Sequence, residues 1–225
     1  MKKILVVINF ILLVFVTIFI YKKVNHKVPK NCNYSLSAFD FHYKKQTDTP
    51  AIVMLGDSRI GQGNWNDLLS RTDVINRGIY GDKMYCICNR LNYLKNPFTK
   101  ICFIEGGLLD MRTEEVDSIV SSYKKIVSFW QSNKVIPVIN TIVHISQQAS
   151  PQYGDANKKI ALVNDKLKLF AKQNSIDIID MNLKLTNEAT LLLKPEFSAD
   201  GAHFNQKAYE LWAKEVNTIL KRNKI

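Results

Sequence analysis

Three side chains of this sequence have the chemistry and the order of a nucleophile, an orienting carboxylate and a base. Ser58 ends the segment Ile52 to Ser58, in which a short apolar run leads directly into Gly-Asp-Ser. Far downstream, Asp200 stands three residues before His203 in the segment Asp-Gly-Ala-His. A histidine that takes a serine proton while a carboxylate holds its ring is the machinery of attack on acyl groups. The sequence therefore predicts a triad of Ser58, His203 and Asp200.

Neither the Gly-Asp-Ser segment nor the Asp-Gly-Ala-His segment is specific on its own. A Gly-Asp-Ser tripeptide occurs by chance in about one in twenty chains of this length, and an ordinary strand-ending turn would explain it. The positions add weight, because Ser58 follows a predicted strand and Asp200 and His203 precede the predicted last helix. Open α/β sheets bind ligands at the carboxyl ends of their strands. We expect Gly56 to relieve crowding in the turn before Ser58.

Over roughly residues 50–222 the chain resembles the SGNH hydrolases, also called the GDSL lipase/esterase superfamily. The resemblance rests on Gly56-Asp57-Ser58, on the segment Asn76 to Asp82 and on Asp200-Gly201-Ala202-His203. It implies a flavodoxin-like αβα sandwich in which Ser58 is the nucleophile, His203 the base and Asp200 its orienting partner. It also implies an oxyanion hole made by the Ser58 amide, the Gly81 amide and an asparagine side chain. No metal or organic cofactor is implied.

The third block of the family pattern is different here. The family has Gly-x-Asn-Asp, whereas this chain has Gly107-Leu108-Leu109-Asp110, so Leu109 stands where the oxyanion asparagine is expected. Loss of one side-chain donor lowers turnover by about two to three orders of magnitude, or roughly 2.7–4 kcal/mol. Either Asn140, after the predicted fourth strand, or Arg59, beside the nucleophile, supplies the third hydrogen bond, or the chain is a slow or inactive member.

The N-terminus has the pattern of a membrane anchor. Eighteen largely apolar residues, Ile4 to Tyr21, are flanked by two lysines on each side, and at 1.5 Å per residue they span about 27 Å, close to the thickness of a bilayer core. Because no small-residue cleavage site follows, an uncleaved anchor is favoured over a signal peptide, and the lack of an amphipathic period disfavours a buried core helix. We therefore predict an anchor over residues 1–23, a linker over 24–49 and an SGNH hydrolase-like domain over 50–225.

Charge counting and the family resemblance indicate opposite orientations for this anchor. Lysines flank both ends, and counting charges alone would keep the C-terminal domain in the cytoplasm. The family resemblance points to envelope esterases, and a short N-terminal tail is commonly retained inside. The expected location is therefore a single-pass membrane protein with an extracytoplasmic C-terminal domain.

The charge distribution narrows the range of binding partners. The formal net charge is +11, of which +6 lies in residues 1–50, where eight lysines meet two aspartates. Basic residues beside a membrane span favour anionic lipid headgroups, and nothing resembles a nucleic-acid-binding motif.

The four cysteines lack zinc-site spacing and are predicted to be buried thiols, or to form one or two disulfides if the compartment is oxidising. They are Cys32, Cys86, Cys88 and Cys102.

Apolar runs alternate with helical patterns, which predicts a parallel five-stranded sheet covered on both faces. The predicted strands are Ala51–Leu55, Val74–Ile75, Ile101–Glu105, Val135–Asn140 and Ile176–Asp180. Apolar residues recur at helical spacing in Thr113–Gln131, with Thr113 as the expected N-cap, and again around residues 160–170 and 208–219. The aromatic residues of these helices are expected to be core rather than a substrate box.

These elements gather the candidate residues at one edge of the sheet. His144 follows the fourth strand and could line the cleft there, although a solvated loop histidine is the favoured interpretation. The leading hypothesis is a membrane-anchored serine esterase acting on an acyl ester, for example an O-acetyl group, of a small molecule or glycan. Transfer of the acyl group to a sugar hydroxyl is a related alternative. A non-catalytic envelope binding protein of the same fold is the alternative from another class.

Overall fold

The computed structural model of the protein describes residue 32 and residues 49–225. The predicted anchor over residues 1–23 and nearly all of the predicted linker over 24–49 lie outside this part of the chain. Of the helices in residues 49–225, none is long and apolar enough to cross a membrane.

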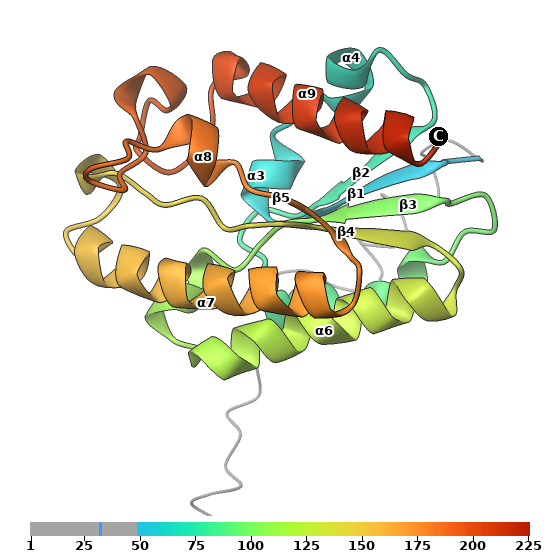
Figure 1. Cartoon of the computed structure of the whole chain (residues 1–225), viewed down its shortest axis with the longest axis horizontal. Coiled ribbons are helices and arrows are strands. Elements are labelled where there is room, and N and C mark those ends of the chain that lie inside the picture. Colours follow the sequence, from blue (N-terminus) through green and yellow to red (C-terminus); the bar gives the residue numbers. More distant parts are fainter. Residues whose placement is uncertain (1–31, 33–48) are drawn as a thin grey trace, which may run out of the picture. The chain divides into compact units, whose positions relative to one another are not determined.

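Five parallel strands form a single sheet in the order β2-β1-β3-β4-β5 (Figure 1). Ile52 of β1 lies opposite Val74 of β2 on one side and Ile101 of β3 on the other. This order is the flavodoxin-like one, so the predicted parallel five-stranded sheet is confirmed. The strands are β1 (Ile52–Gly56), β2 (Val74–Gly78), β3 (Ile101–Ile104), β4 (Ile136–Asn140) and β5 (Asp177–Ile179).

Helices cover both faces of this sheet (Figure 1). One face carries α5 (Met84–Asn89), α6 (Val116–Ser132) and α7 (Tyr153–Gln173). The opposite face carries α3 (Ser58–Gly61), α4 (Trp65–Leu69), α8 (Asn182–Leu185) and α9 (Gln206–Arg222). Short 3-10 helices complete the connections: η1 (Leu91–Leu94), η2 (Leu109–Arg112), η3 (Gln147–Ala149) and η4 (Pro195–Phe197).

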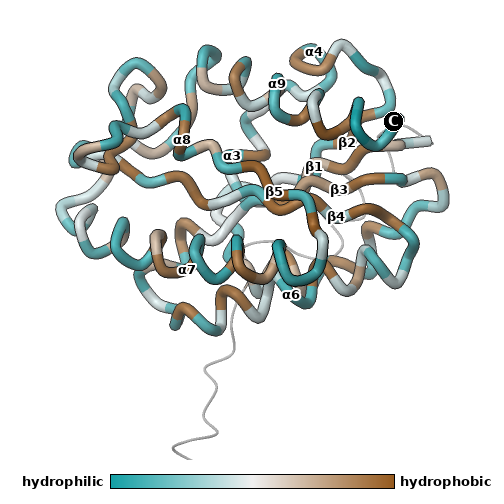
Figure 2. The backbone as a smooth tube through the Cα atoms, viewed as in Figure 1, coloured by the Kyte–Doolittle hydropathy of each residue, from teal (hydrophilic) through white to brown (hydrophobic). Residues whose placement is uncertain are grey.

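The alternation of side chains along β1 explains why two apolar layers form. Val53 and Leu55 pack with the α5–α7 layer, whereas Ile52 and Met54 pack with the α9 layer. Because both faces of every central strand are covered, these strands are apolar throughout, as Figure 2 shows for the middle of the molecule.

The α9 layer contains a cluster of aromatic rings. Trp212 packs edge-on against Trp65 at 5.0 Å between ring centroids and stacks on Tyr209 at 6.1 Å. Trp130 of α6 is 1% exposed in the other layer. The aromatic residues of the predicted helices are therefore core, as expected.

The start of α6 differs from the prediction. The helix begins at Val116 after Glu115, and Thr113 is not its N-cap. The chain first completes η2 at Arg112, and the Thr113 hydroxyl instead accepts a hydrogen bond from the Lys83 ammonium at 2.8 Å. A tertiary contact has replaced the local capping interaction.

The cysteines fall into two classes. Cys32 and Cys86 are disulfide-bonded, whereas Cys88 and Cys102 are free thiols. Burial raises the pKa of both free thiols, that of Cys102 strongly. These two side chains are therefore poor nucleophiles.

Candidate active site

Ser58 lies immediately after β1, on the first turn of a short helix. Asp57 is the single residue between β1 and α3, and its carboxylate caps that helix by accepting a hydrogen bond from the Arg59 amide at 3.0 Å. This connection holds the half-buried Ser58 at the sheet edge beside β1 and β3, where the order of the strands reverses. Such a switch point is where open α/β sheets bind ligands.

The structure brings the three residues of the predicted triad together. Ser58 Oγ lies 3.0 Å from His203 Nε2, although the two residues are 145 positions apart. His203 Nδ1 in turn lies 2.6 Å from Asp200 Oδ2. The three side chains thus form one continuous chain of hydrogen bonds.

The environment of Asp200 sets the direction of these hydrogen bonds. Burial alone would raise the pKa of Asp200, but hydrogen bonds from the His203 ring and from the Ala202 and His203 amides outweigh it and hold the pKa well below its ordinary value. An ionised carboxylate can only accept hydrogen bonds. His203 Nδ1 therefore carries a proton and donates a hydrogen bond to Asp200, which leaves Nε2 free to accept a hydrogen bond from the Ser58 hydroxyl.

A cleft of about 900 Å³ opens over Ser58 and His203. One part of its lining is apolar and is made by Leu108, Leu109, Met111, Ile145, Ala149 and Ala156. The polar part includes Tyr80, Arg112, Gln152, Asp155 and Lys159. Sequence reasoning did not single out Tyr80, Arg112 or Lys159 as lining residues. Tyr80 lies inside the second family block, directly before Gly81, and Arg112 lies two residues after the third block, so both had a signal; Lys159 had none.

Two backbone amides of the predicted oxyanion hole are available in this cleft. Ser58 and Gly81 both line it, and Gly81 has φ of +80°, a left-handed conformation that favours glycine. Among the described residues, neither amide has a hydrogen-bond acceptor in the protein. Leu109 lines the same cleft with 43% of its surface exposed, so an apolar side chain occupies the position expected for an asparagine.

Asn140 is not part of the cleft. Its amide nitrogen donates to the Ile104 carbonyl at 3.1 Å and its amide oxygen accepts from Trp212 Nε1 at 2.8 Å. The side chain is 1% exposed and links β4 to β3 and to α9. The structure therefore does not support Asn140 as a substitute oxyanion donor.

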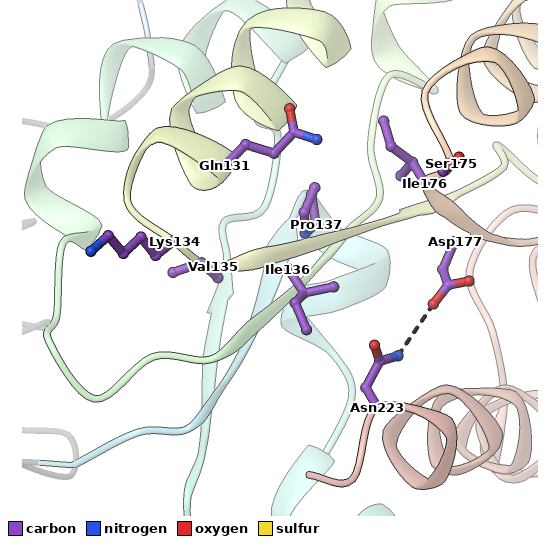
Figure 3. A pocket seen from close by; sticks show the side chains of 9 residues that line it. All are labelled: Gln131, Lys134, Val135, Ile136, Pro137, Ser175, Ile176, Asp177 and Asn223. Atoms are coloured by element: carbon purple, nitrogen blue, oxygen red, sulfur yellow. Dashed lines mark hydrogen bonds between the residues drawn. The ribbon is translucent and has the colours of Figure 1, made fainter.

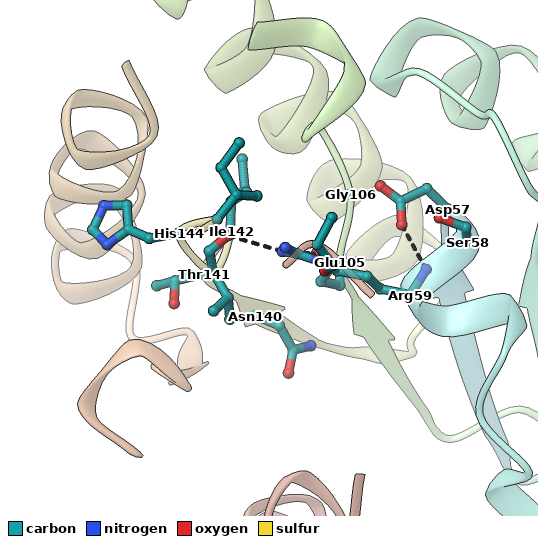
Figure 4. A network of polar contacts seen from close by, with 12 residues as sticks. Asp57, Ser58, Arg59, Glu105, Gly106, Asn140, Thr141, Ile142 and His144 are labelled. Carbon is teal, nitrogen blue, oxygen red and sulfur yellow. Dashed lines mark hydrogen bonds and ion pairs between the residues drawn. The ribbon is translucent and has the colours of Figure 1, made fainter. Parts of the chain in front are cut away.

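Arg59 is likewise turned away from the cleft, and it ties three segments together. Figure 4 shows its side chain extending from α3 toward the segment that follows β4. Nη1 donates to the Val143 carbonyl at 2.9 Å, Nε donates to the Ala202 carbonyl at 3.0 Å, and the guanidinium lies over the Phe204 ring at 4.7 Å. Ala202 and Phe204 are the two neighbours of His203, so Arg59 holds the histidine loop rather than the oxyanion.

Two buried carboxyl groups lie beneath the nucleophile. Asp57 and Glu105 are 3% and 1% exposed, and Glu105 Oε1 lies 3.8 Å from Arg59 Nη1. Burial raises the pKa of both groups, that of Glu105 strongly, against the lowering effect of the Arg59 charge.

His144 is buried, so the interpretation as a solvated loop histidine was wrong. It is 6% exposed, it does not line the cleft, and its ring points away from Ser58 (Figure 4). Burial lowers the pKa of His144. The segment after β4 is drawn into the core because asparagine side chains satisfy its backbone: Asn182 accepts from the His144 amide and Asn164 from the Ile142 amide.

A second hollow, of about 410 Å³, lies near the amino ends of β4 and β5, away from Ser58 (Figure 3). Asn223 donates to Asp177 there at 3.2 Å. The lining of this hollow contains no histidine or cysteine. In the described part of the chain, no group of three or more His, Cys, Asp or Glu side chains could hold a metal ion.

Comparison with solved structures identifies the class of fold. A GDSL-like lipase from Bacteroides thetaiotaomicron superposes with a TM-score of 0.72 at 17% identity, covering 83% of this chain and 96% of its own. A lipase/acylhydrolase from Enterococcus faecalis gives a TM-score of 0.64 at 21% identity, covering 78% and 97%. The chain therefore has the fold of the SGNH hydrolase superfamily, as its sequence blocks indicated.

Sequence comparison adds a partial relationship. No family profile matches the chain. N-acylneuraminate cytidylyltransferases of Streptococcus agalactiae serotypes V and III are each 29% identical over 139 residues, which is 58% of this chain and 32% of theirs. The chain thus spans about a third of the length of these curated relatives.

Proposed function

We propose that this protein is a serine ester hydrolase that acts through Ser58, His203 and Asp200. The observation that carries the proposal is the hydrogen-bonded chain from Ser58 Oγ through His203 to Asp200, with its serine end lining a cleft. The SGNH hydrolase fold supports the same conclusion, because its solved examples include proteins described as lipases and acylhydrolases.

The geometry suggests the following reaction. Ser58 Oγ attacks the ester carbonyl while its proton passes to His203 Nε2, and the amides of Ser58 and Gly81 donate to the oxyanion. Collapse of this intermediate releases the alcohol, which takes the proton from His203 and leaves Ser58 acylated. Water then attacks the acyl-enzyme with His203 as the base, releasing the carboxylic acid and restoring Ser58. Asp200 stabilises the imidazolium in both halves.

The substrate we propose is an ester borne by a sugar or another small molecule, such as an O-acetyl group on an envelope glycan. The curated relatives are named for N-acylneuraminate, a sugar, which supports this choice. Their cytidylyl transfer is not proposed for this chain, because it spans only about a third of their length. If a sugar hydroxyl reaches the acyl-enzyme before water does, the same machinery is an O-acyltransferase.

A fluorophosphonate probe tests the proposal without knowledge of the natural substrate, because labelling requires only an activated serine. We expect the protein to be labelled and to hydrolyse 4-nitrophenyl acetate, and we expect Ser58→Ala to lose both properties. Ser70→Ala, at an exposed serine after α4, is the matched control and keeps both.

The competing proposal is a non-catalytic binding protein, and the specific observation in its favour is Leu109 in the oxyanion position. It would be established by a folded wild-type protein that resists fluorophosphonate and cleaves no activated ester. Hydrolysis and acyl transfer are separated by adding a sugar acceptor and measuring the ratio of acylated sugar to free acid.

A further inference from the structure

Two cationic side chains line the cleft beside Ser58, and the proposed hydrolysis does not use them. They are Arg112 and Lys159. Within residues 49–225, neither of these side chains forms an ion pair. Arg112 ends η2 and is exposed, whereas Lys159 lies on α7 and is half-buried. The two cations therefore come from different elements and face the same space.

A hydrogen bond fixes Lys159 against η2, the element that ends at Arg112. Lys159 Nζ donates to the Met111 carbonyl at 3.2 Å, and Met111 directly precedes Arg112. The bond joins α7 to η2 and uses only one of the three ammonium protons. The other two protons, and the donors of Arg112, remain for a ligand.

Neither acidic residue that lines the cleft forms an ion pair with Arg112 or Lys159. Asp155 is ion-paired with Lys158, at 3.5 Å between Oδ1 and Nζ. Asp57 is 3% exposed, and its carboxyl group accepts a hydrogen bond from the Arg59 amide at 3.0 Å. Arg112 and Lys159 thus keep donors free for an entering ligand, and like-signed charges in a concave site attract an oppositely charged ligand.

We propose that the ester substrate carries a carboxylate, which Arg112 and Lys159 bind while the acyl carbonyl lies at Ser58. This inference rests on the proposed ester hydrolysis and names the substrate class for it. Arginine offers paired donors that match the two oxygens of a carboxylate, and the ammonium adds a point charge beside it. The two residues would then determine specificity, because a neutral ester leaves both cations without a partner.

Two pairs of esters test this proposal by differing only in charge. The first pair is 4-acetoxybenzoate and its methyl ester, which places the carboxylate on the alcohol side. The second is mono-4-nitrophenyl succinate and its methyl ester, which places it on the acyl side. We expect kcat/KM to favour the charged member of at least one pair by about 10-fold or more. That ratio should fall as salt is added, since exposed charges are screened.

Variants connect the preference to the two cations. We expect Arg112→Gln and Lys159→Gln each to reduce the ratio about 5-fold or more, mainly through KM. Lys172→Gln, at an exposed lysine in the last turn of α7, should keep the wild-type ratio. Equal rates for both members of both pairs, or a ratio that survives both substitutions, would overturn the proposal.

A binding measurement separates failure of this inference from failure of the proposed function. In the Ser58→Ala background, calorimetry compares the Kd of 4-acetoxybenzoate with that of its methyl ester. If 4-acetoxybenzoate binds more tightly than its methyl ester and Arg112→Gln removes this difference, the charge recognition is supported even if no ester is cleaved. Equal binding together with cleavage of neutral esters by the wild type rejects the recognition and leaves the hydrolase standing.

Discussion

At the scale of single residues, Leu109 is the point at which the candidate site differs from the pattern of the SGNH hydrolases. It lies in the cleft where a hydrogen-bond donor would stabilise an oxyanion, and neither Asn140 nor Arg59 is placed to replace it. We expect Leu109→Asn to raise turnover of 4-nitrophenyl acetate by up to about two orders of magnitude. The gain should appear in kcat rather than KM, because the charge that an oxyanion donor stabilises develops only in the transition state.

The matched control is Leu109→Val, which keeps an apolar side chain and should not reproduce the gain. The double variant with Ser58→Ala should have no activity. Unchanged turnover in a folded Leu109→Asn protein would mean that another group already completes the oxyanion hole.

Arg59 should affect the same reaction from a distance, as a positioning residue. Lysine in its place keeps the charge but cannot reach both the Val143 and the Ala202 carbonyls with fork geometry. We expect Arg59→Lys to lower kcat at least about 10-fold and to slow fluorophosphonate labelling by a similar factor, with KM changed less. Steady-state kinetics and labelling rates measured on the same preparation check this.

The control for Arg59 is Arg71→Lys, at a partly exposed arginine that pairs with Asp73. It should leave kcat and labelling at wild-type levels. A purely structural role for Arg59 would lower thermal stability while the folded fraction kept its full kcat, and that result would reject the positioning role.

The grouping of Ser58, His203 and Asp200 could be predicted because their residue types and sequence blocks match a known family pattern, and the structure places them within hydrogen-bond distance. The roles of Asn140, Arg59 and His144 could not be predicted, because each depends on partners distant in the chain. Trp212 occupies the Asn140 amide oxygen, and the Ala202 carbonyl accepts from the Arg59 guanidinium. A sequence shows that such groups can donate or accept, but only the fold decides with which partner.

At the scale of elements, α5 is capped by a residue from another part of the chain. The Asp110 carboxylate, in η2, accepts a hydrogen bond from the amide of Met84, the first residue of α5, at 3.1 Å. Burial raises the pKa of Asp110 to about 6, against the lowering effect of this hydrogen bond. The native state therefore binds the Asp110 proton more tightly than the unfolded chain does.

This shift has a definite sign in the free energy of unfolding. Between about pH 4 and pH 6, Asp110 is protonated to a greater extent in the folded protein than in the unfolded chain. The contribution of Asp110 to the free energy of unfolding therefore falls as the pH rises through this range. We expect Asp110→Asn, whose amide oxygen can still accept the Met84 N–H, to gain stability relative to wild type on going from pH 4 to pH 8. A shift from 3.8 to about 6 sets the upper limit of this gain at about 3 kcal/mol.

Denaturant unfolding at both pH values measures the gain. Asp165→Asn, at an exposed aspartate of α7, is the control and should show no such difference between the two pH values. A difference between Asp110→Asn and wild type that is the same at pH 4 and pH 8 would contradict the assignment.

Strand positions were predicted better than helix starts. Each of the five strands lies within or beside its predicted apolar run, because central strands buried on both faces must be apolar. The β2 strand extends to Gly78. The prediction ended at Ile75 because Asn76 and Arg77 interrupt the apolar pattern of the sequence. The Asn76 amide donates to the carbonyls of Ile60, Gly61 and Gly63, which the local sequence does not reveal.

At the scale of the whole molecule, the N-terminal sequence determines the expected location in the cell. We propose that residues 1–23 anchor the protein with its C-terminal domain outside the cytoplasm. A phosphatase reporter fused after Ile225 should then be active, because that enzyme needs export, and deletion of residues 1–24 should release the domain from membranes. The same reporter fused to a chain that lacks residues 1–24 is the control, and activity of a cytoplasmic reporter at Ile225 would reverse the assignment.

The tie between the first and last segments of the domain has a consequence for biosynthesis. His203 reaches Ser58 across 145 residues, Arg59 holds the histidine loop, and the Tyr209 hydroxyl of α9 donates to the Arg59 carbonyl at 2.6 Å. A ribosome-bound chain that has emerged only as far as β5 therefore has its nucleophile but neither its base nor the contacts that orient it. With the roles proposed above for Ser58 and His203, the serine becomes reactive only after α9 docks.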